Sequence, residues 1–341
     1  MRRIGIAFTG VPHPVRKLAE FAELAEKNEM ESFWIAEDYF LRDAISTLAC
    51  LAFVTSRIKV AVGAINPFTR HPVLIAETIA TIDELSHGRT VLAIGAGVKP
   101  LVEQMCIEYR KPLTAVRESV EVIRRLLKGE TLTYRGSSIC LKDVKLGVNP
   151  YLGMLGSFTP TGDRVPIYVA AEGPKMLELA GEIADGVLLP VGYSVNDVRM
   201  AIEHVKIGAE RSGRKREDID VACYILTSIS EDPSFEHGAA RTFVANLLGA
   251  VDEDYQLRNA IDPNDAKTIR TKVEHGVDGD FLRKDVSERA LVTFTASGTR
   301  DRCLGLLEKY QSAGVRLPIV FPVNADFRAT IDLARTYAIR H

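Results

Sequence analysis

The sequence predicts a parallel (β/α)8 barrel of the TIM type, an α/β fold, and three observations lead to this prediction. Eight apolar runs recur along the 341 residues, amphipathic helical stretches lie between them, and several runs end in glycine-rich or charged loops. The runs are continuous rather than alternating, as expected for strands that are buried on both faces. Because a strand–helix unit repeated eight times closes into a barrel, we expect the chemistry in the loops that follow the strands.

The eight predicted strands cover residues 4–8, 32–36, 58–62, 90–94, 166–170, 186–190, 219–228 and 317–321. Between them, residues 15–28 and 112–128 place apolar side chains three and four positions apart, which predicts amphipathic helices. Gly88 is predicted to be the left-handed cap of the third helix, because strand 4 starts directly after it.

We expect one domain over residues 1–341 with two insertions, because barrels of this kind routinely exceed 250 residues. The first insertion, at about 130–165, lies after the helix of strand 4 and contains a hairpin-like stretch. The second, at about 230–298, is mostly helical in pattern and directly follows strand 7. It is therefore expected over the C-terminal face as a lid or substrate wall, with a helical buttress or dimer surface as the alternative.

The composition is that of an ordinary cytoplasmic enzyme with a large core. The net charge of −2 gives no indication of a nucleic-acid or anionic-membrane partner. No apolar run approaches the roughly 18 residues that a membrane span needs, and no signal-peptide pattern follows the basic start. The five cysteines form no C-x-x-C pair and no H-E-x-x-H occurs, so neither a disulfide framework nor a metal site is predicted.

The turn after strand 5 is a candidate phosphate-binding site. Its residues are Ala171, Glu172, Gly173, Pro174, Lys175 and Met176. Gly173 allows a close backbone approach, and Pro174 suits the first position of a helix whose exposed amides, with Lys175, attract an anion. A plain strand-to-helix turn with a proline start is the alternative.

Two further loops are candidates for ligand binding. Gly95, Ala96 and Gly97 follow strand 4, but Pro100 stands where a dinucleotide fingerprint has its third glycine, so we do not assign that motif. These small residues instead leave room for a flat ring. Glu37 and Asp38 follow strand 2 and could supply a general acid or a hydrogen-bond acceptor, or they could be capping or solvated carboxylates.

Longer stretches make the chain similar to a known family. They are GIAF (5–8), FWIAEDY (33–39), IKVAVGAINPFTRHP (58–72), ATIDELSHGRTVLAIGAG (80–97), IEYRKPLTAVRESV (107–120), VPIYVAAEGPKMLELAGEIADGVLL (165–189) and IDVACY (219–224). With these stretches the chain resembles the luciferase-like flavin and deazaflavin barrel family, and within it the coenzyme F420-dependent methylenetetrahydromethanopterin reductases.

The resemblance implies a cofactor site at the C-terminal mouth of the barrel. The ring of F420 would lie against a bulge at a non-prolyl cis peptide, here Gly63–Ala64, with Asn66 and residues 95–97 bordering it. The phosphate-bearing tail would meet residues 171–176, and Glu37 and Asp38 would lie near the polar edge of the ring as the candidate catalytic residues.

The implied activity is hydride transfer between F420 and a pterin-type one-carbon carrier by a homodimeric enzyme. The chain departs from the reductases at three positions: Ala7 and Val98 stand where they have carboxylates, and Asp38 stands where they have a histidine. Two alternatives stay open. One is an FMN-dependent monooxygenase or a flavin-dependent methylenetetrahydrofolate reductase-like enzyme. The other is a catalytically silent, dimeric cofactor-binding member of the family.

Overall fold

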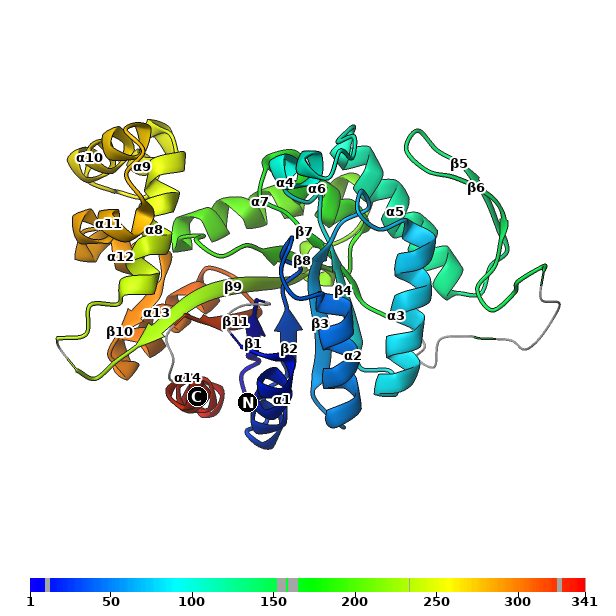
Figure 1. Ribbon diagram of the computed structural model, residues 1–341, viewed down its shortest axis with the longest axis horizontal. Coiled ribbons are helices and arrows are strands. Elements are labelled where there is room, and N and C mark those ends of the chain that lie inside the picture. Colours follow the sequence, from blue (N-terminus) through cyan, green and yellow to red (C-terminus); the bar gives the residue numbers. More distant parts are fainter. Residues whose placement is uncertain (10–12, 152–157, 159–164, 233, 324–326, 341) are drawn as a thin grey trace. The chain divides into compact units, whose positions relative to one another are not determined.

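The strands form the (β/α)8 barrel that the sequence predicts (Figure 1). The computed structural model describes residues 1–9, 13–151, 158, 165–232, 234–323 and 327–340. The barrel strands agree with the predicted runs within a few residues: β1 (Gly5–Phe8), β2 (Ser32–Ile35), β3 (Lys59–Ile65), β4 (Thr90–Ile94), β7 (Ile167–Ala170), β8 (Gly186–Leu189), β9 (Asp220–Ile229) and β11 (Leu317–Pro322).

Helices separate these strands along the chain, and α1 and α5 confirm the two predicted amphipathic helices. The first seven are α1 (Val15–Lys27), α2 (Ala44–Val54), α3 (Pro72–Ser86), α4 (Lys99–Gln104), α5 (Pro112–Leu127), α6 (Pro174–Ile183) and α7 (Val195–Arg211). The others are α8 (Gly238–Ala250), α9 (Glu253–Arg258), α10 (Pro263–Glu274), α11 (Gly279–Leu282), α12 (Glu288–Phe294), α13 (Arg300–Ser312) and α14 (Phe327–Ile339).

The chain divides into two compact units. The β2–β8 unit comprises residues 8–188 and 204–220, and the β9–β11 unit comprises residues 1–7, 189–203 and 221–341. In the β2–β8 unit, β2, β3, β4, β7 and β8 pair in that order, all in parallel. Their residues are almost fully buried, which explains why the predicted runs lack alternation.

Strand β3 is longer than predicted and reaches Ile65, so Gly63 and Ala64 lie inside the strand and not after it. The pairing of β3 with β4 shifts register between Val62 and Ile65, which marks a bulge. The Gly63–Ala64 peptide bond is cis, as the resemblance implied. The strand therefore continues past its predicted end because the bulge restores its pairing with β4.

Gly88 was predicted to be the left-handed cap at the end of α3. It is left-handed, but His87 before it is left-handed too. Gly88 is left-handed with φ 80°, and its N–H donates to Asp83 O at 2.9 Å. His87 before it is also left-handed, with φ 56°, and it is the residue that caps the helix. Two successive left-handed residues reverse the chain so tightly that β4 can begin at Thr90.

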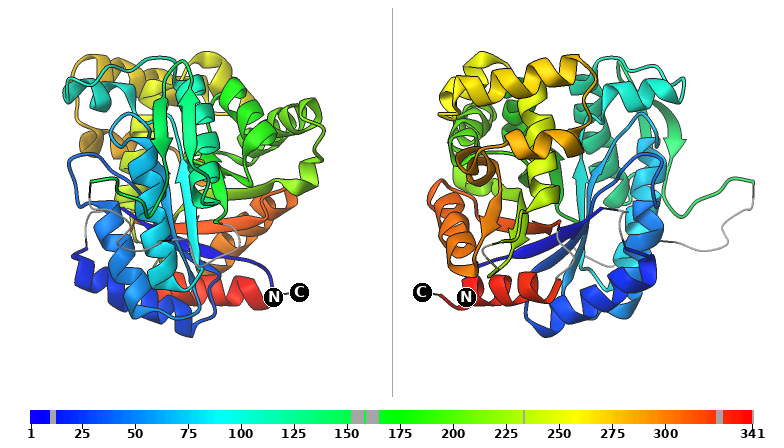
Figure 2. Two further views of the ribbon diagram at one scale, coloured as in Figure 1. Left: turned by 90° about the vertical axis from the view of Figure 1, so that its right-hand side faces the viewer. Right: turned by 60° about the vertical axis from the view of Figure 1, so that its left-hand side comes forward.

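An antiparallel hairpin lies in the first predicted insertion, next to helix α5 (Figures 1 and 2). Its strands are β5 (Leu132–Arg135) and β6 (Cys140–Val144). The Glu118 carboxylate of α5 accepts hydrogen bonds from the backbone N–H groups of residues 137–139 at 2.6 to 2.9 Å, which fixes the hairpin turn. Residues 152–157 and 159–164 of this insertion lie outside the described residues.

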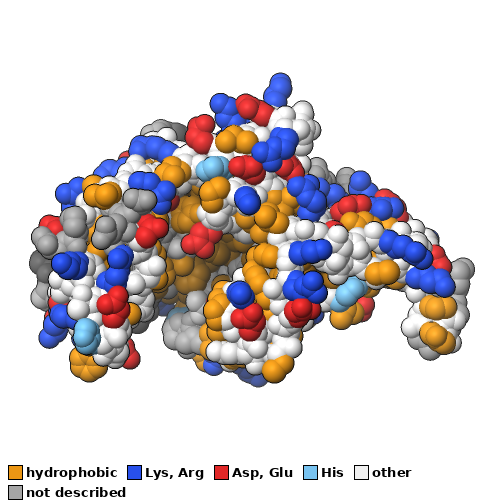
Figure 3. Space-filling model, turned by 90° about the horizontal axis from the view of Figure 1, so that it is seen from above, with side chains coloured by type: hydrophobic (Ala, Val, Ile, Leu, Met, Phe, Trp, Pro, Cys, Tyr) orange, Lys and Arg blue, Asp and Glu red, His pale blue; other side chains and the backbone are white. Residues whose placement is uncertain are grey.

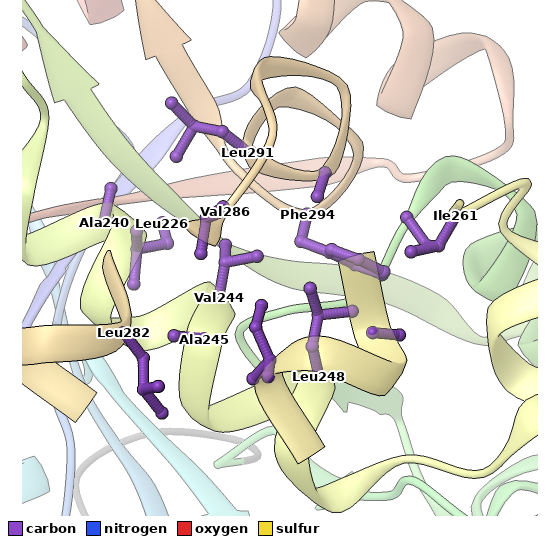
Figure 4. Close-up of a cluster of buried hydrophobic side chains, with 13 residues drawn as sticks. Leu226, Ala240, Val244, Ala245, Leu248, Ile261, Leu282, Val286, Leu291 and Phe294 are labelled. Atoms are coloured by element: carbon purple, nitrogen blue, oxygen red, sulfur yellow. The ribbon is translucent and has the colours of Figure 1, made fainter. Parts of the chain in front are cut away.

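The β9–β11 unit contains the second insertion, which is mostly helical as predicted, from α8 to α12. Its strands pair in parallel in the order β10 (Ala296–Gly298), β9, β11, β1. The three-residue β10 was not predicted, because its sequence Ala-Ser-Gly has no apolar run. The insertion helices bury a core of their own against Leu226 of β9, with Val244, Leu248 and Phe294 among its members (Figure 4).

The surface carries charges of both signs. On the face seen in Figure 3, Lys and Arg side chains are interspersed with Asp and Glu side chains, in keeping with the net charge of −2. Within the described part of the chain, no helix combines the length and the apolar character needed to cross a bilayer.

Candidate active site

Three small residues meet where β3, β4 and β7 end, all within the β2–β8 unit. A Cβ atom on Gly95 would lie 3.2 Å from the Ala170 Cβ and 3.3 Å from the Ala64 Cβ. The Gly95 N–H donates to Ile65 O at 2.9 Å, directly beyond the bulge. Neighbouring strand ends with so little side-chain volume make a floor that fits a flat ring. We call Ala64, Gly95 and Ala170 the ring floor.

A hydrogen-bond network lies beside the ring floor and joins three loops. Asn66 is buried, and its Oδ1 accepts from the backbone N–H of Phe68 at 3.0 Å and Thr69 at 2.9 Å. Its Nδ2 donates to Tyr39 Oη at 3.0 Å, and the Val98 N–H donates to the same oxygen at 3.0 Å. The network therefore fixes the loops after β2, β3 and β4 in one arrangement.

Gly97 is required by this network for two reasons. Its φ of +75° is a left-handed conformation that glycine adopts at little cost. A Cβ atom there would also lie 2.5 Å from Tyr39 Oη, too close for any side chain. Close packing therefore explains both glycines of the Gly95-Ala96-Gly97 loop. A side chain at Gly95 would crowd Ala64 and Ala170, and one at Gly97 would clash with Tyr39.

Glu37 and Asp38 lie half-buried in the loop after β2. Glu37 Oε2 is buried and has no hydrogen-bond partner among the described residues. Burial raises the pKa of Glu37, and the nearby Asp43 carboxylate raises it further, which outweighs the Ala44 N–H and the charge of Arg70. Glu37 is therefore the carboxyl group of this loop that is disposed to hold a proton.

The turn after β7 is open to solvent, as the phosphate-binding hypothesis requires. Ala171 is buried and its N–H donates to Leu188 O at 3.2 Å, whereas residues 172–175 are exposed and Met176 is half-buried. Pro174 is the first residue of α6, as predicted, and the N-cap residue before it is Gly173, which has no side chain to cap the helix. A Cβ on Gly173 would meet nothing within 4 Å, so a ligand has room to approach the backbone.

Two polar residues of the loop after β3, Arg70 and His71, have local structural partners. His71 caps α3 by accepting from the Val73 N–H at 3.3 Å. Arg70 donates to Thr78 Oγ1 at 3.3 Å and lies 3.8 Å from the Asp43 carboxylate. No group of His, Cys, Asp and Glu side chains in the described ranges is arranged to hold a metal ion.

A surface cavity of about 660 Å³ lies elsewhere in the β2–β8 unit, along α5, the end of α6 and the segment after α7. Its lining is charged, but three of its arginines, Arg117, Arg124 and Arg125, have acidic partners. Arg124 lies 3.0 Å from Asp185, and Arg125 lies 2.7 Å from Glu130. Because these charges neutralise each other, the cavity is explained by ion pairs between helices and we do not assign it to the chemistry.

No role was predicted for Tyr39, or for the aromatic pair beside it. The rings of Phe68 and Tyr109 stack 4.6 Å apart, and the pKa of Tyr109 is raised by burial and further by the nearby Tyr39. Tyr39 directly follows Glu37 and Asp38 at a strand end, which was a usable signal. Its partners Asn66 and Val98 are 27 and 59 residues away, so the network itself could not be seen in the sequence.

Comparisons with known proteins show the family to which the chain belongs. A family model described as luciferase-like monooxygenase matches residues 4–317. The 5,10-methylenetetrahydromethanopterin reductase of Methanolobus tindarius is 34% identical and covers 89% of each chain. The Archaeoglobus fulgidus enzyme of the same name is 33% identical and covers 93% of each chain.

Solved structures extend the comparison to the fold. The coenzyme F420-dependent tetrahydromethanopterin reductase of Methanopyrus kandleri matches with a TM-score of 0.86 at 29% identity, covering 99% of this chain and 98% of that one. An F420-dependent secondary alcohol dehydrogenase matches over the full length of both chains with a TM-score of 0.78. At 20% identity, this second match supports the barrel fold alone.

Proposed function

The chain belongs to the luciferase-like family, and we propose that it is an F420-dependent oxidoreductase that transfers hydride between F420 and a pterin-type one-carbon carrier. The observation that carries the proposal is the similarity to methylenetetrahydromethanopterin reductases at 33–34% identity over about nine tenths of the chain. The ring floor supports it, because a planar deazaflavin needs a surface without projecting side chains.

The residues present fit the cofactor. We propose that Gly63, Ala64, Asn66 and residues 95–97 hold the ring, and that residues 171–176 hold the phosphate of the tail. The bound deazaflavin would supply the hydride chemistry at its C5 position. The protein would position it: the buried Asn66 and the bulge fix one edge, and the uncapped start of α6 with Lys175 attracts the anionic tail.

The carboxyl groups of the β2 loop are the proposed proton-handling groups. Val98 and the fully buried Ala7 cannot supply the acids that the reductases have at these positions. Glu37, whose pKa is raised mainly by burial, retains its proton at a higher pH than an exposed glutamate. We propose that Glu37 or Asp38 provides the acid that protonates a substrate nitrogen as the carbon accepts hydride.

The decisive experiment titrates the purified protein with F420 and, separately, with FMN, and follows the fluorescence of each. We expect F420 to bind, and we expect methylenetetrahydropterins to be reduced when the reduced form of F420 is supplied as the hydride donor. Binding of FMN with oxygen consumption would favour the monooxygenase alternative. Binding of F420 without turnover of any pterin, alcohol or imine would favour the silent family member.

Variants of two exposed lysines test the tail site. Lys175→Ala should raise the Kd for F420 about fivefold at low salt, because an anion at a helix start loses its counter-charge. Lys142→Ala, which removes an equally charged side chain from the exposed face of the hairpin, should leave Kd within twofold. Equal effects of the two variants would show that Lys175 acts only through net charge.

We further propose that the protein is a cytoplasmic homodimer that pairs through α2. This helix is mostly apolar, with Ser46 as its exposed polar residue, and its outer face carries Ile45, Ala49 and Phe53 at spacings of four. Phe53 is 78% exposed. Phe53→Glu should convert a dimer into a monomer in light-scattering measurements. Phe281→Glu on α11, where the ring is 77% exposed, is the matched control and should not.

A further inference from the structure

The groups around the Tyr39 hydroxyl determine whether it donates or accepts hydrogen bonds. A tyrosine hydroxyl has two acceptor lone pairs and one proton to donate. Both acceptor positions are taken, by Asn66 Nδ2 and by the Val98 N–H, each at 3.0 Å. The hydroxyl can therefore only donate, and no acceptor for its proton occurs among the residues that the structure describes.

The position of this hydroxyl is fixed by groups that are themselves fixed. Asn66 is only 1% exposed and is oriented by the N–H groups of Phe68 and Thr69. Gly97 packs directly against Tyr39 Oη. A donor held by so many contacts loses little entropy when a ligand accepts its hydrogen bond, which is the requirement for a binding group.

Tyr39 also lies beside the proposed cofactor site. Its partner Asn66 is two residues beyond Ala64, and Gly97 is two residues beyond Gly95, so the network borders the ring floor. Burial raises the pKa of Tyr39 above its ordinary value of about 10, and the Glu37 carboxylate raises it further, against the lowering effect of the Val98 N–H. The hydroxyl thus keeps its proton at neutral pH.

We propose that Tyr39 is a ligand-binding residue that donates a hydrogen bond to a carbonyl oxygen of the molecule bound on the ring floor. The proposal rests on the proposed function and deepens it, because it assigns a specific donor to the site. The accepting oxygen belongs either to the deazaflavin ring or to the pterin substrate. Both are carbonyl-bearing heterocycles, and the experiment separates them.

The test compares Tyr39→Phe with Tyr109→Phe, a neighbouring phenol whose oxygen makes no hydrogen bond in the described structure. For each variant, Kd for F420 is measured without substrate, and KM is measured for a methylenetetrahydropterin. An increase in Kd of at least fivefold for Tyr39→Phe, with Tyr109→Phe within twofold, assigns the oxygen to the cofactor. A KM increase of that size at unchanged Kd assigns it to the substrate. Equal behaviour of the two variants overturns the proposal.

Loss of the Tyr39 oxygen also leaves Asn66 and Val98 without an acceptor, so a second measurement separates donation from structural support. A fluorinated tyrosine at position 39 has a lower phenol pKa than tyrosine. Above that pKa the phenolate accepts more strongly from Asn66 and Val98 but cannot donate. A donor role predicts that ligand affinity falls with rising pH through this titration. A purely structural role predicts constant or tighter binding and would overturn the proposal.

Controls distinguish failure of this inference from failure of the proposed function. Fluorotyrosine at position 109 reports the effect of an added negative charge and should leave affinity within twofold. If the wild-type protein binds FMN and not F420, the F420 assignment fails, and the same variants test Tyr39 with FMN. If it binds neither, the proposed function and the role of Tyr39 both fail.

Discussion

Glu26 and Glu37 are the same residue type in the same unit, at opposite ends of its parallel strands, and their pKa values shift in opposite directions. Burial tends to raise the pKa of Glu26, but the backbone N–H groups of Ile58, Arg57 and Ser56 outweigh it and lower the pKa. Glu37 is also buried in part, but it has fewer donors, and the Asp43 carboxylate adds to the increase. The number of hydrogen-bond donors around each carboxylate therefore decides whether its pKa is raised or lowered.

Arg89 lies at the same end of the strands as Glu26, where β3 begins, and its hydrogen-bonding groups are also satisfied. Its guanidinium donates to Ser86 O, Thr55 Oγ1, Thr55 O, Ile58 O and Ala52 O at 2.5 to 3.0 Å. Every partner is a neutral oxygen, and together they join the end of α2 to the starts of β3 and β4. At the other end, Glu37 Oε2 has no partner among the described residues. In barrels, the N-terminal face stabilises the fold and the C-terminal face carries the chemistry, and this difference follows that rule.

Removing Arg89 should have the largest effect on stability. Arg89→Ala leaves several part-buried oxygens without donors, so we expect the free energy of unfolding to fall by about 3 kcal/mol in urea denaturation. Arg57→Ala, which removes an exposed guanidinium from the same loop, should change it by less than about 0.5 kcal/mol. Similar losses for both would contradict the role given to the Arg89 hydrogen bonds.

A substitution at the opposite end should affect turnover instead. Asp38→Ala is expected to lower kcat at least tenfold, or about 1.4 kcal/mol in activation free energy, with little change in unfolding. Glu23→Ala, on the exposed face of α1, is the control for loss of a carboxylate. Steady-state kinetics with F420 and pterin provide the measurement. Unchanged kinetics for Asp38→Ala would remove this residue from the proposed mechanism.

Glu26→Gln should reduce stability at pH 7 by about 1 kcal/mol, because a neutral amide accepts more weakly from the three N–H groups and solvent screens the exposed part. The pKa of Glu26 is lowered on folding, so its contribution is present above the ordinary glutamate pKa. It is lost as pH falls through the lowered folded-state pKa. Denaturation at several pH values should show the two proteins converging in acid.

Glu37→Gln should have a smaller effect of the opposite sign, a gain of about 0.5 kcal/mol at pH 7. The pKa of Glu37 is raised on folding, so ionisation costs stability as pH rises from the ordinary value of about 4.5 through the folded-state pKa. The variant lacks this cost, and the gain should vanish below that window. A variant that is less stable than the wild type at pH 7 would show that Glu37 supports the fold.

Much of the fold was predictable because its determinants are local. The apolar runs predicted all eight barrel strands, the helical spacing predicted α1 and α5, and Pro174 predicted the start of α6. The prediction was incomplete where the determinant was a neighbouring strand. The end of β3 at Ile65 depends on pairing with β4 beyond the bulge, and the short β10 depends on β9.

The sequence by itself determined the barrel, its helical insertion and the family, because hydrophobic period, turn residues and motifs act over a few neighbouring positions. Only the tertiary structure decided which polar groups are satisfied. Glu26 meets its donors about 30 positions along the chain, and Tyr39 meets Val98 59 positions away. Those distances are closed by strand pairing and core packing. The hydrogen bonds of Glu26 and Arg89 at one end of the strands, and the Tyr39 hydroxyl without an acceptor among the described residues at the other, could therefore be seen only in the folded chain.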